Sequence, residues 1–168
     1  MHILDLLRNK YESHRRDFEK RRYTPRTYPE YLRRCGAQVG EDCSIAAMNM
    51  DVGIEAYLVK IGNQVEIARD VAFITHDGAA WVFRHLVPDV QVAGPIVLED
   101  NASIGRGAIL CPGIRIGRNS VVAPGSLVIS DVPPGAFVQG VPARAVAPSR
   151  TRAVSDLPQP AGSDFARS

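Results

Sequence analysis

Four histidines are the side chains of this sequence best suited to general acid–base chemistry, because an imidazole can both accept and release a proton near neutral pH. They are His2, His14, His76 and His85. The first two fall in a basic N-terminal segment, where we expect solvated surface positions. His76 and His85 fall in one stretch in the middle of the chain, so this stretch is the candidate site.

Asp77 directly follows His76, but neighbouring residues of an extended segment point in opposite directions. A His–Asp pair therefore requires a turn at Gly78 that redirects one of the two side chains. Asp77 has two other possible roles, which are to hold hydroxyl groups of an acceptor or to bind a backbone amide. The sequence assigns no other carboxylate to orient His76, and a backbone carbonyl would serve as well.

Few residues of this chain are suited to cysteine or metal chemistry. The three cysteines, Cys35, Cys43 and Cys111, form neither an even set nor a CxxC pair, so we expect free thiols in a reducing cytoplasm. Cys111 has no adjacent base and is interpreted as a packing residue. No metal site is expected, because a three-histidine site on the later part of the chain would need histidines beyond His85.

Composition excludes several classes of protein. The chain has 168 residues, 45% of them hydrophobic, and 20 basic against 18 acidic side chains give a net charge of +2. This balance offers no general attraction for nucleic acid. The apolar runs are shorter than a membrane-spanning helix requires, and the N-terminus lacks the order of a signal peptide. We therefore expect a cytoplasmic protein without membrane insertion.

The elements that position His76 are indicated by a period of six. Ile61, Ile67 and Phe73 follow this spacing, and a second series does so later in the chain. Its members are Leu98, Ile104, Leu110, Ile116, Val122 and Val128. Short strands with turns at this period are typical of a parallel β-helix, in which three units of six make one coil and equivalent aliphatic residues stack.

The two series are out of phase, which indicates a loop excursion. Phe73 and Leu98 are 25 positions apart, one more than a multiple of six. We therefore predict that residues 75–94 leave the coil, whereas Val39 to Ile74 is expected to make two regular coils. Around this β-helix, residues 1–35 are predicted to form a short N-terminal helical segment. Residues 147–168, which contain three prolines, are predicted to form a disordered, flexible tail.

Residues 39–146 resemble the hexapeptide-repeat acyltransferases, and among them the galactoside, maltose and polysaccharide O-acetyltransferases. The resemblance rests on Ile104-Gly105, Ile116-Gly117 and Ala123-Pro124-Gly125-Ser126, and more specifically on the closing segments Asp131-Val132-Pro133-Pro134-Gly135 and Gly140-Val141-Pro142-Ala143-Arg144. It implies an all-β, left-handed parallel β-helix over residues 36–146. It also implies a homotrimer, with acyl-CoA in the groove between neighbouring subunits.

The resemblance further implies a set of site residues. The family places its catalytic histidine at the position of His76. Small residues at the corners would let the pantetheine arm of acetyl-CoA lie close to the backbone. The basic residue at Arg144 would reach the nucleotide phosphates, and Arg118 is an additional basic candidate because Ile129-Ser130 stands where relatives often have Thr-Lys. The cofactor-binding candidates are therefore Gly105, Gly107, Pro124, Ser126, Arg118 and Arg144.

The acceptor side is expected to use the excursion and the segment before Ile61. Trp81 and Phe83 either stack on a sugar ring or pack on the next subunit, and His85 is either structural or faces the acceptor. The place of Arg106 in the groove stays open. The substrate-binding candidates are Asp77, Trp81, Arg84, His85, Asn49 and Glu55, with Asp51 beside the last two.

The function that the resemblance implies is transfer of an acetyl group from acetyl-CoA to a hydroxyl of a carbohydrate, by direct transfer in a ternary complex. The alternative is N-acetylation of an amino sugar linked to a nucleotide. A metal-dependent hydratase of the γ-carbonic anhydrase type is disfavoured by the missing histidines. A non-catalytic scaffold is disfavoured by the His76 excursion and by the closing segment.

Overall fold

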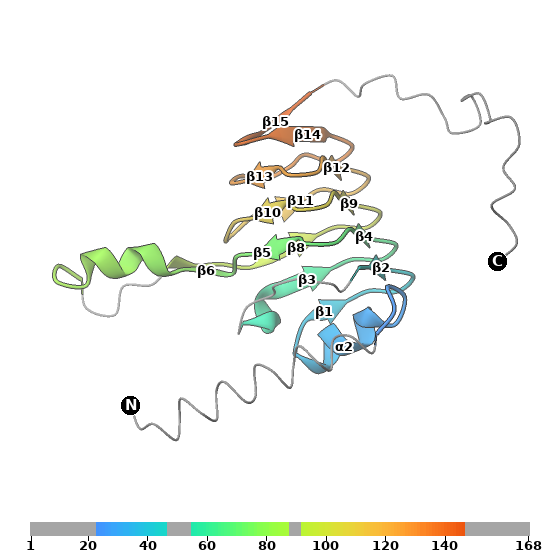
Figure 1. Cartoon of the computed structure of the whole chain (residues 1–168), viewed down its shortest axis with the longest axis horizontal. Coiled ribbons are helices and arrows are strands. Elements are labelled where there is room, and N and C mark those ends of the chain that lie inside the picture. Colours follow the sequence, from blue (N-terminus) through green and yellow to red (C-terminus); the bar gives the residue numbers. More distant parts are fainter. Residues whose placement is uncertain (1–22, 47–54, 88–91, 147–168) are drawn as a thin grey trace, which may run out of the picture.

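Short strands stacked into a column form the body of the molecule, from which one arm projects sideways (Figure 1). The computed structural model describes residues 23–46, 55–87 and 92–146, with the side chains of 79–81 excepted. The predicted N-terminal helix before Tyr23 and the predicted tail 147–168 lie outside these residues, as do Asn49 and Asp51.

Three sheets make the faces of the column. Face A contains β1 (Gln38–Val39), β3 (Val59–Ile61), β8 (Ile96–Leu98) and β11 (Arg115–Ile116). Face B contains β2 (Ser44–Ile45), β4 (Glu66–Ile67), β9 (Ser103–Ile104), β12 (Val121–Val122), β14 (Phe137–Gly140) and β15 (Ala143–Ala145). Face C contains β5 (Ala72–Phe73), β10 (Ile109–Leu110) and β13 (Leu127–Val128). Apart from β15, neighbouring strands of these faces run parallel, which confirms the predicted parallel architecture.

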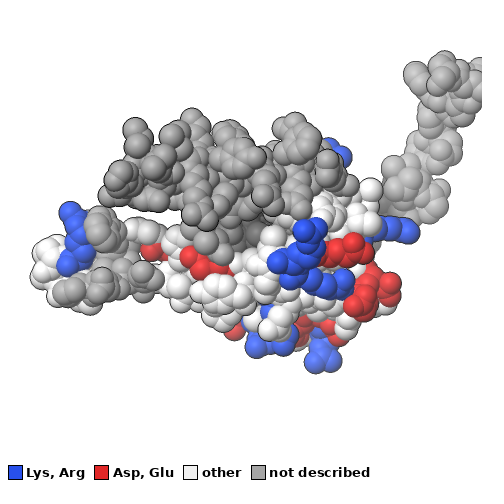
Figure 2. Space-filling model, turned by 90° about the horizontal axis from the view of Figure 1, so that it is seen from below, with Lys and Arg blue, Asp and Glu red and all other residues white. Residues whose placement is uncertain are grey.

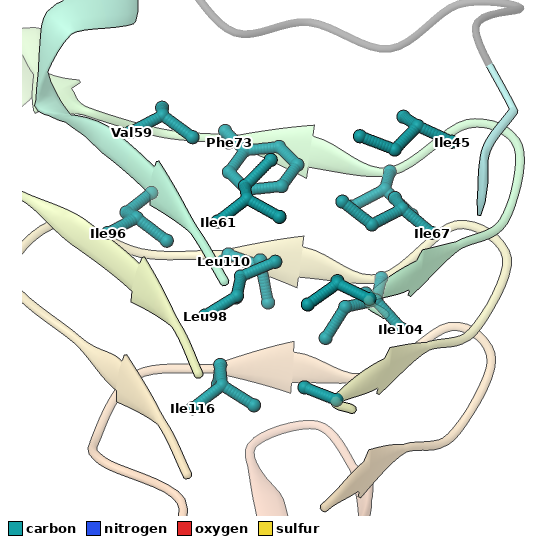
Figure 3. Close-up of a cluster of buried hydrophobic side chains, with 14 of the residues drawn as sticks. Ile45, Val59, Ile61, Ile67, Phe73, Ile96, Leu98, Ile104, Leu110 and Ile116 are labelled. Carbon is teal, nitrogen blue, oxygen red and sulfur yellow. The ribbon is translucent and has the colours of Figure 1, made fainter. Parts of the chain in front are cut away.

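Aliphatic side chains fill the interior of the column at the predicted period. Leu98 lies opposite Ile116, Ile104 opposite Val122, and Leu110 opposite Val128, so a regular coil takes 18 residues. All six side chains are buried. Figure 3 shows Leu98, Ile104, Leu110 and Ile116 stacked with other aliphatic side chains in the interior. Each two-residue strand turns one side chain inward and one outward, as the pleat of a strand requires. The strands are therefore too short to show the long alternation of an ordinary sheet.

The first coil is longer than the sequence period predicts. Ile45 lies opposite Ile67, which is 22 positions further along, so this coil contains four residues more than a regular one. The prediction of two regular coils from Val39 to Ile74 is therefore wrong. The described part of the insertion includes the short 3-10 helix η1 (Ala56–Leu58), which directly follows Glu55.

The arm leaves the column after β5 and returns before β8. Its root is an antiparallel pair of strands, β6 (His76–Asp77) and β7 (Val92–Ala93), and the 3-10 helix η2 (Gly78–Phe83) follows β6. Exposed apolar side chains gather on it, namely Val82, Phe83, Leu86 and Val87. The backbone of the arm projects away from the column (Figure 1).

One α-helix covers the beginning of the column within the described residues. α2 (Tyr28–Arg34) packs against β1 and β2, and buries Tyr28 and Leu32. Pro29 stands in its first turn, where a missing backbone N–H costs no intrahelical hydrogen bond. None of the helices in the described ranges has the length and the apolar composition needed to cross a bilayer.

Charged side chains of both signs lie next to one another on the face seen in Figure 2. Two of the described ion pairs join neighbouring coils. Arg106 pairs with Asp70 at 2.8 Å, and Arg115 pairs with Glu99 at 3.0 Å. Surface pairs of this kind contribute about 1 kcal/mol or less each to stability. The stack of aliphatic side chains therefore dominates the energetics of the column.

Gly117 allows the last two coils to approach each other, and this close approach can be tested. A Cβ atom at Gly117 would lie 2.8 Å from the carbonyl carbon of Pro133 and would also overlap Pro134. Because these neighbours are backbone atoms, Gly117→Ala should lower the free energy of unfolding by about 1–3 kcal/mol. Chemical denaturation measures the change.

Gly78→Ala is the matched control, because a Cβ atom at Gly78 meets no atom within 4 Å. Its effect on the free energy of unfolding should stay within about 0.5 kcal/mol. Equal effects of the two substitutions would contradict the close packing of the coils at Gly117.

Candidate active site

His76 lies at the root of the arm, where the chain leaves face C. Its side chain is 50% exposed, while Thr75 before it is 1% exposed. The backbone is held on both sides of the junction, since Ile74 donates to the carbonyl of Leu110 and Gly94 donates to the carbonyl of Thr75. The imidazole therefore projects from a fixed backbone into space that solvent reaches.

Glu55 is the carboxylate that contacts His76. Its Oε2 lies 3.0 Å from Nδ1 of His76 and 2.9 Å from the hydroxyl oxygen of Thr75. Glu55 belongs to the insertion before β3, whereas His76 follows β5, so the pair is made by folding and not by proximity in sequence. The Glu55 side chain is 24% exposed, which leaves the pair partly shielded from water.

The pKa of Glu55 is lowered below the ordinary value for glutamate. Desolvation of the carboxyl is the largest single effect and raises this pKa, but the hydrogen bonds from Thr75 and His76, a backbone hydrogen bond and the charge of His76 together outweigh it. An ionised carboxylate can only accept hydrogen bonds, so Nδ1 of neutral His76 carries the proton and donates it. The other ring nitrogen, Nε2, then has the lone pair of a general base.

The remaining acceptor candidates are distributed along the arm. Asp77 follows His76 in β6, and its carboxylate is close enough to Cys111 to raise the pKa of that thiol, although burial is the larger cause. Nδ1 of His85 lies 3.1 Å from the carbonyl oxygen of Val82, so His85 is engaged within its own turn. Arg84 is exposed, and the side chain of Trp81 lies outside the described part of the structure.

Gly94 anchors the returning strand of the arm against the next coil. A Cβ atom at this position would lie 2.7 Å from the nitrogen and 2.8 Å from the Cα of Gly113. Only glycine fits this contact without moving backbone, and the same residue donates its N–H to Thr75. The root of the arm is thereby fixed to the column beside His76.

The small residues predicted to bind the cofactor meet at one corner, between faces B and C. Gly105 packs beneath Pro124, where a Cβ would overlap the backbone, and Gly107 has a positive φ of 69°. Ser126 is buried, and its hydroxyl accepts the N–H of Gly140 at 3.3 Å. The fold thus has its own use for Gly105, Gly107 and Ser126, and their contact with a cofactor stays a prediction.

The two predicted basic residues lie in different places. Arg144 stands opposite Gln139 in the β14–β15 pair, beyond the corner of Pro124, and donates to the carbonyl of Ala143. Arg118 lies at the other corner, between faces A and B, where its N–H binds Glu99. Within one chain, Arg118 is therefore separated from the other cofactor candidates.

Arg118 also lines an open hollow on face A, together with Lys60, Val97 and Arg115. The hollow contains neither His76 nor Glu55 and has charges of both signs. The hollow is therefore not part of the surroundings of the imidazole. The cluster of His76, Glu55 and Thr75 is therefore the better candidate for the reacting centre.

The sequence reasoning placed Glu55 near the acceptor and missed its contact with His76. The six-residue period could not reveal the contact, because the insertion that contains Glu55 interrupts that period. Thr75 was not singled out at all. The signal that could have found it is the residue type at this corner of the repeat, because the repeat places Pro112 and Ser130 at the equivalent positions and so does not require a threonine there.

Comparison with known proteins agrees with this fold and indicates that the chemistry is the transfer of a group. The family described as bacterial transferase hexapeptide (six repeats) matches residues 88–130. Protein CapG of Staphylococcus aureus is 40% identical over 116 residues, which are 68% of this chain and 67% of CapG. The acetyltransferase VCA0836 of Vibrio cholerae, which contains hexapeptide repeats, has a solved structure with a TM-score of 0.60. It is 22% identical, and the match covers 88% of this chain and 93% of that one.

A second curated relative names an acyl acceptor. The 2,3,4,5-tetrahydropyridine-2,6-dicarboxylate N-acetyltransferase of Staphylococcus aureus (strain JH9) is 38% identical over 71 residues. These residues are 42% of this chain and 29% of that enzyme. The chain thus spans less than a third of the length of this relative.

Proposed function

Because the chain belongs to the bacterial hexapeptide-repeat transferases and is an acyltransferase, we propose that it moves an acetyl group from acetyl-CoA to a carbohydrate hydroxyl. The observation that carries the proposal is the Glu55–His76 pair at the root of the arm. A hydroxyl is a weak nucleophile at neutral pH, and this pair supplies the base that it needs.

In the proposed mechanism, the acceptor and acetyl-CoA are bound together. Nε2 of His76 takes the proton of the acceptor hydroxyl while the oxygen attacks the thioester carbonyl. The tetrahedral intermediate then collapses, the carbon–sulfur bond breaks, and the leaving thiolate of CoA takes the proton from the imidazolium. Glu55 holds the ring through Nδ1 and stabilises the imidazolium while it is charged.

The carbohydrate acceptor rests on the resemblance of the closing segment to sugar and polysaccharide O-acetyltransferases. The arm begins at His76, the proposed general base, and is therefore the proposed acceptor side. It contains the acceptor candidates Asp77, Trp81, Arg84 and His85. On the acetyl-CoA side, the proposed contacts are the corner of Gly105, Gly107, Pro124 and Ser126, and Arg144 beyond that corner. Arg118 would come from the neighbouring subunit, across the groove between the two subunits.

N-acetylation is the second candidate, and the match to an N-acetyltransferase favours it. The two candidates give products that differ in stability, because mild alkali releases an ester but leaves an amide. A mass-spectrometric screen of acetyl-CoA with sugars, nucleotide sugars and oligosaccharides, followed by alkali, distinguishes them.

We also propose that the coil is left-handed, that the β-helix domain spans residues 36–146, that the protein is cytoplasmic and that it forms a homotrimer. Face C supports the trimer, since its outward residues Ala72, Ile109 and Leu127 are all apolar. Ile109 is 41% exposed, and Ile129 at the next corner is 51% exposed. Face A instead presents Lys60 and Arg115, so face C is the better surface against another copy.

His76→Ala should reduce the turnover number by about 10²–10⁴-fold, because the general base is lost. Affinity for acetyl-CoA, measured by calorimetry, should change little, since the proposed cofactor corner is a separate part of the column. Wild-type activity should fall at acidic pH, where a protonated imidazole cannot accept a proton. A His76→Ala protein with turnover within about threefold of wild type would remove His76 as the base, and inactive His85→Ala would then transfer that role to His85.

Glu55→Gln should reduce turnover by roughly tenfold or more, but by less than loss of the base itself. The amide retains a hydrogen-bond acceptor for Nδ1, whereas the charge that stabilises the imidazolium is gone. Because the pKa of Glu55 is lowered, its charge is present above that lowered pKa and is lost only as the pH falls through it.

The matched control for Glu55→Gln is Glu66→Gln, which removes an exposed carboxylate from the outer side of β4. Turnover of this control should equal that of wild type in steady-state assays. Equal losses in the two variants would assign the effect to overall charge and not to the pair with His76.

Ile109→Glu and Leu127→Glu should each break the trimer, because they place charge on face C. Light scattering should give three times the 18.3 kDa chain mass for wild type and a lower mass for the variants. Lys60→Glu on face A is the control and should remain trimeric. Wild type at a single chain mass at micromolar concentration would refute the proposed assembly.

A further inference from the structure

Thr75 carries a buried hydroxyl that the repeat itself does not require. It is one of three buried polar residues in the described part of the chain, with Ser120 and Ser126. Its equivalents on the next two coils are Pro112, which has no hydroxyl, and Ser130, which is exposed. Packing at this corner therefore needs no hydroxyl, and the one at Thr75 is directed at Glu55 instead.

Thr75 and His76 reach the same carboxylate oxygen. The hydroxyl oxygen of Thr75 lies 2.9 Å from Oε2 of Glu55, and Nδ1 of His76 lies 3.0 Å from it. Because Glu55 is ionised, both groups must donate, and the two hydrogen bonds occupy one oxygen. The hydrogen bond from Thr75 therefore fixes the position at which this oxygen accepts the hydrogen bond from His76.

Thr75 is the rigid member of this cluster. Its carbonyl accepts the N–H of Gly94 at 3.0 Å, and Gly94 is itself in contact with Gly113 on the next coil. Glu55, by contrast, has a long side chain with three rotatable bonds and a carboxylate that water partly reaches. Without a second donor, this carboxylate can turn toward solvent and release Nδ1 of His76.

We propose that Thr75 is a positioning residue, which holds Oε2 of Glu55 against Nδ1 of His76 and so keeps the proton of the neutral imidazole on Nδ1. The inference deepens the proposed function and rests on it for its catalytic meaning. The tautomer matters because only this one leaves Nε2 able to accept a proton. A solvated histidine side chain prefers the proton on Nε2, so the protein must hold the other tautomer.

The tautomer can be read without any acceptor. We would record long-range proton–nitrogen correlation spectra of protein labelled with ¹⁵N-histidine, at mildly alkaline pH where imidazole is neutral. The ring signals of His76 are assigned by their absence in His76→Ala. Wild type and Thr75→Ser should show the proton on Nδ1, whereas Thr75→Val should show a large fraction on Nε2. Ser120→Ala, which removes a buried hydroxyl bound to the carbonyl of Gly117, should match wild type.

A kinetic cycle tests whether Thr75 acts through Glu55. Thr75→Val should lower turnover by about tenfold and leave the KM for acetyl-CoA within about twofold, since only orientation is lost. In a Glu55→Ala background, the same substitution should have no further effect on turnover, because its partner is gone. Independent losses that multiply in the double variant would overturn the proposal.

The two proposals can fail separately. Absence of acetyl transfer by wild type would refute the proposed function, while the spectra would still decide the role of Thr75. A Thr75→Val protein in which His76 keeps the wild-type tautomer would overturn the positioning role even if its activity is low. Should Thr75→Val fold poorly, Thr75→Ala makes the same test, because it also lacks the donor.

Discussion

The stacking of inward aliphatic side chains from coil to coil is the constraint on which the rest of this structure depends. Each strand has only two or three residues on most levels, so no strand is stable without its neighbours. Leu98, Leu110 and Ile116 are held because equivalent residues lie one coil away. Once this register is set, every corner and every outward position is fixed in space.

The active-site candidates depend on the two places where the regular coil is interrupted. Glu55 enters through the extra residues of the first coil, and His76 through the arm that follows face C. Regular coils hold the backbone of each interruption, while the irregular segments supply the polar side chains. The solenoid thus gives rigidity, and the departures from its period give chemistry, which agrees with the general separation of scaffold and functional loops.

The sequence was sufficient to predict the column because six-residue spacing is a local property. The run from Leu98 to Val128 predicted the 18-residue coil and the inward ladder, and the phase change after Phe73 predicted that the chain departs there. The four extra residues before Ile61 were missed, since the aliphatic spacing resumes after them. The contact of Glu55 with His76 could not be predicted, because it depends on how that insertion folds across to the next coil. Without that contact, Thr75 had no visible role.

The two ends of the column differ from its middle, and this difference bears on solubility. A stack of parallel strands has open edges at its first and last levels, and such edges can add further strands from other molecules. Here α2 lies across β1 and β2, and β15 turns back antiparallel along β14. At the first level α2 therefore opposes the addition of strands from another molecule, and at the last level the reversal of β15 ends the parallel stack of face B.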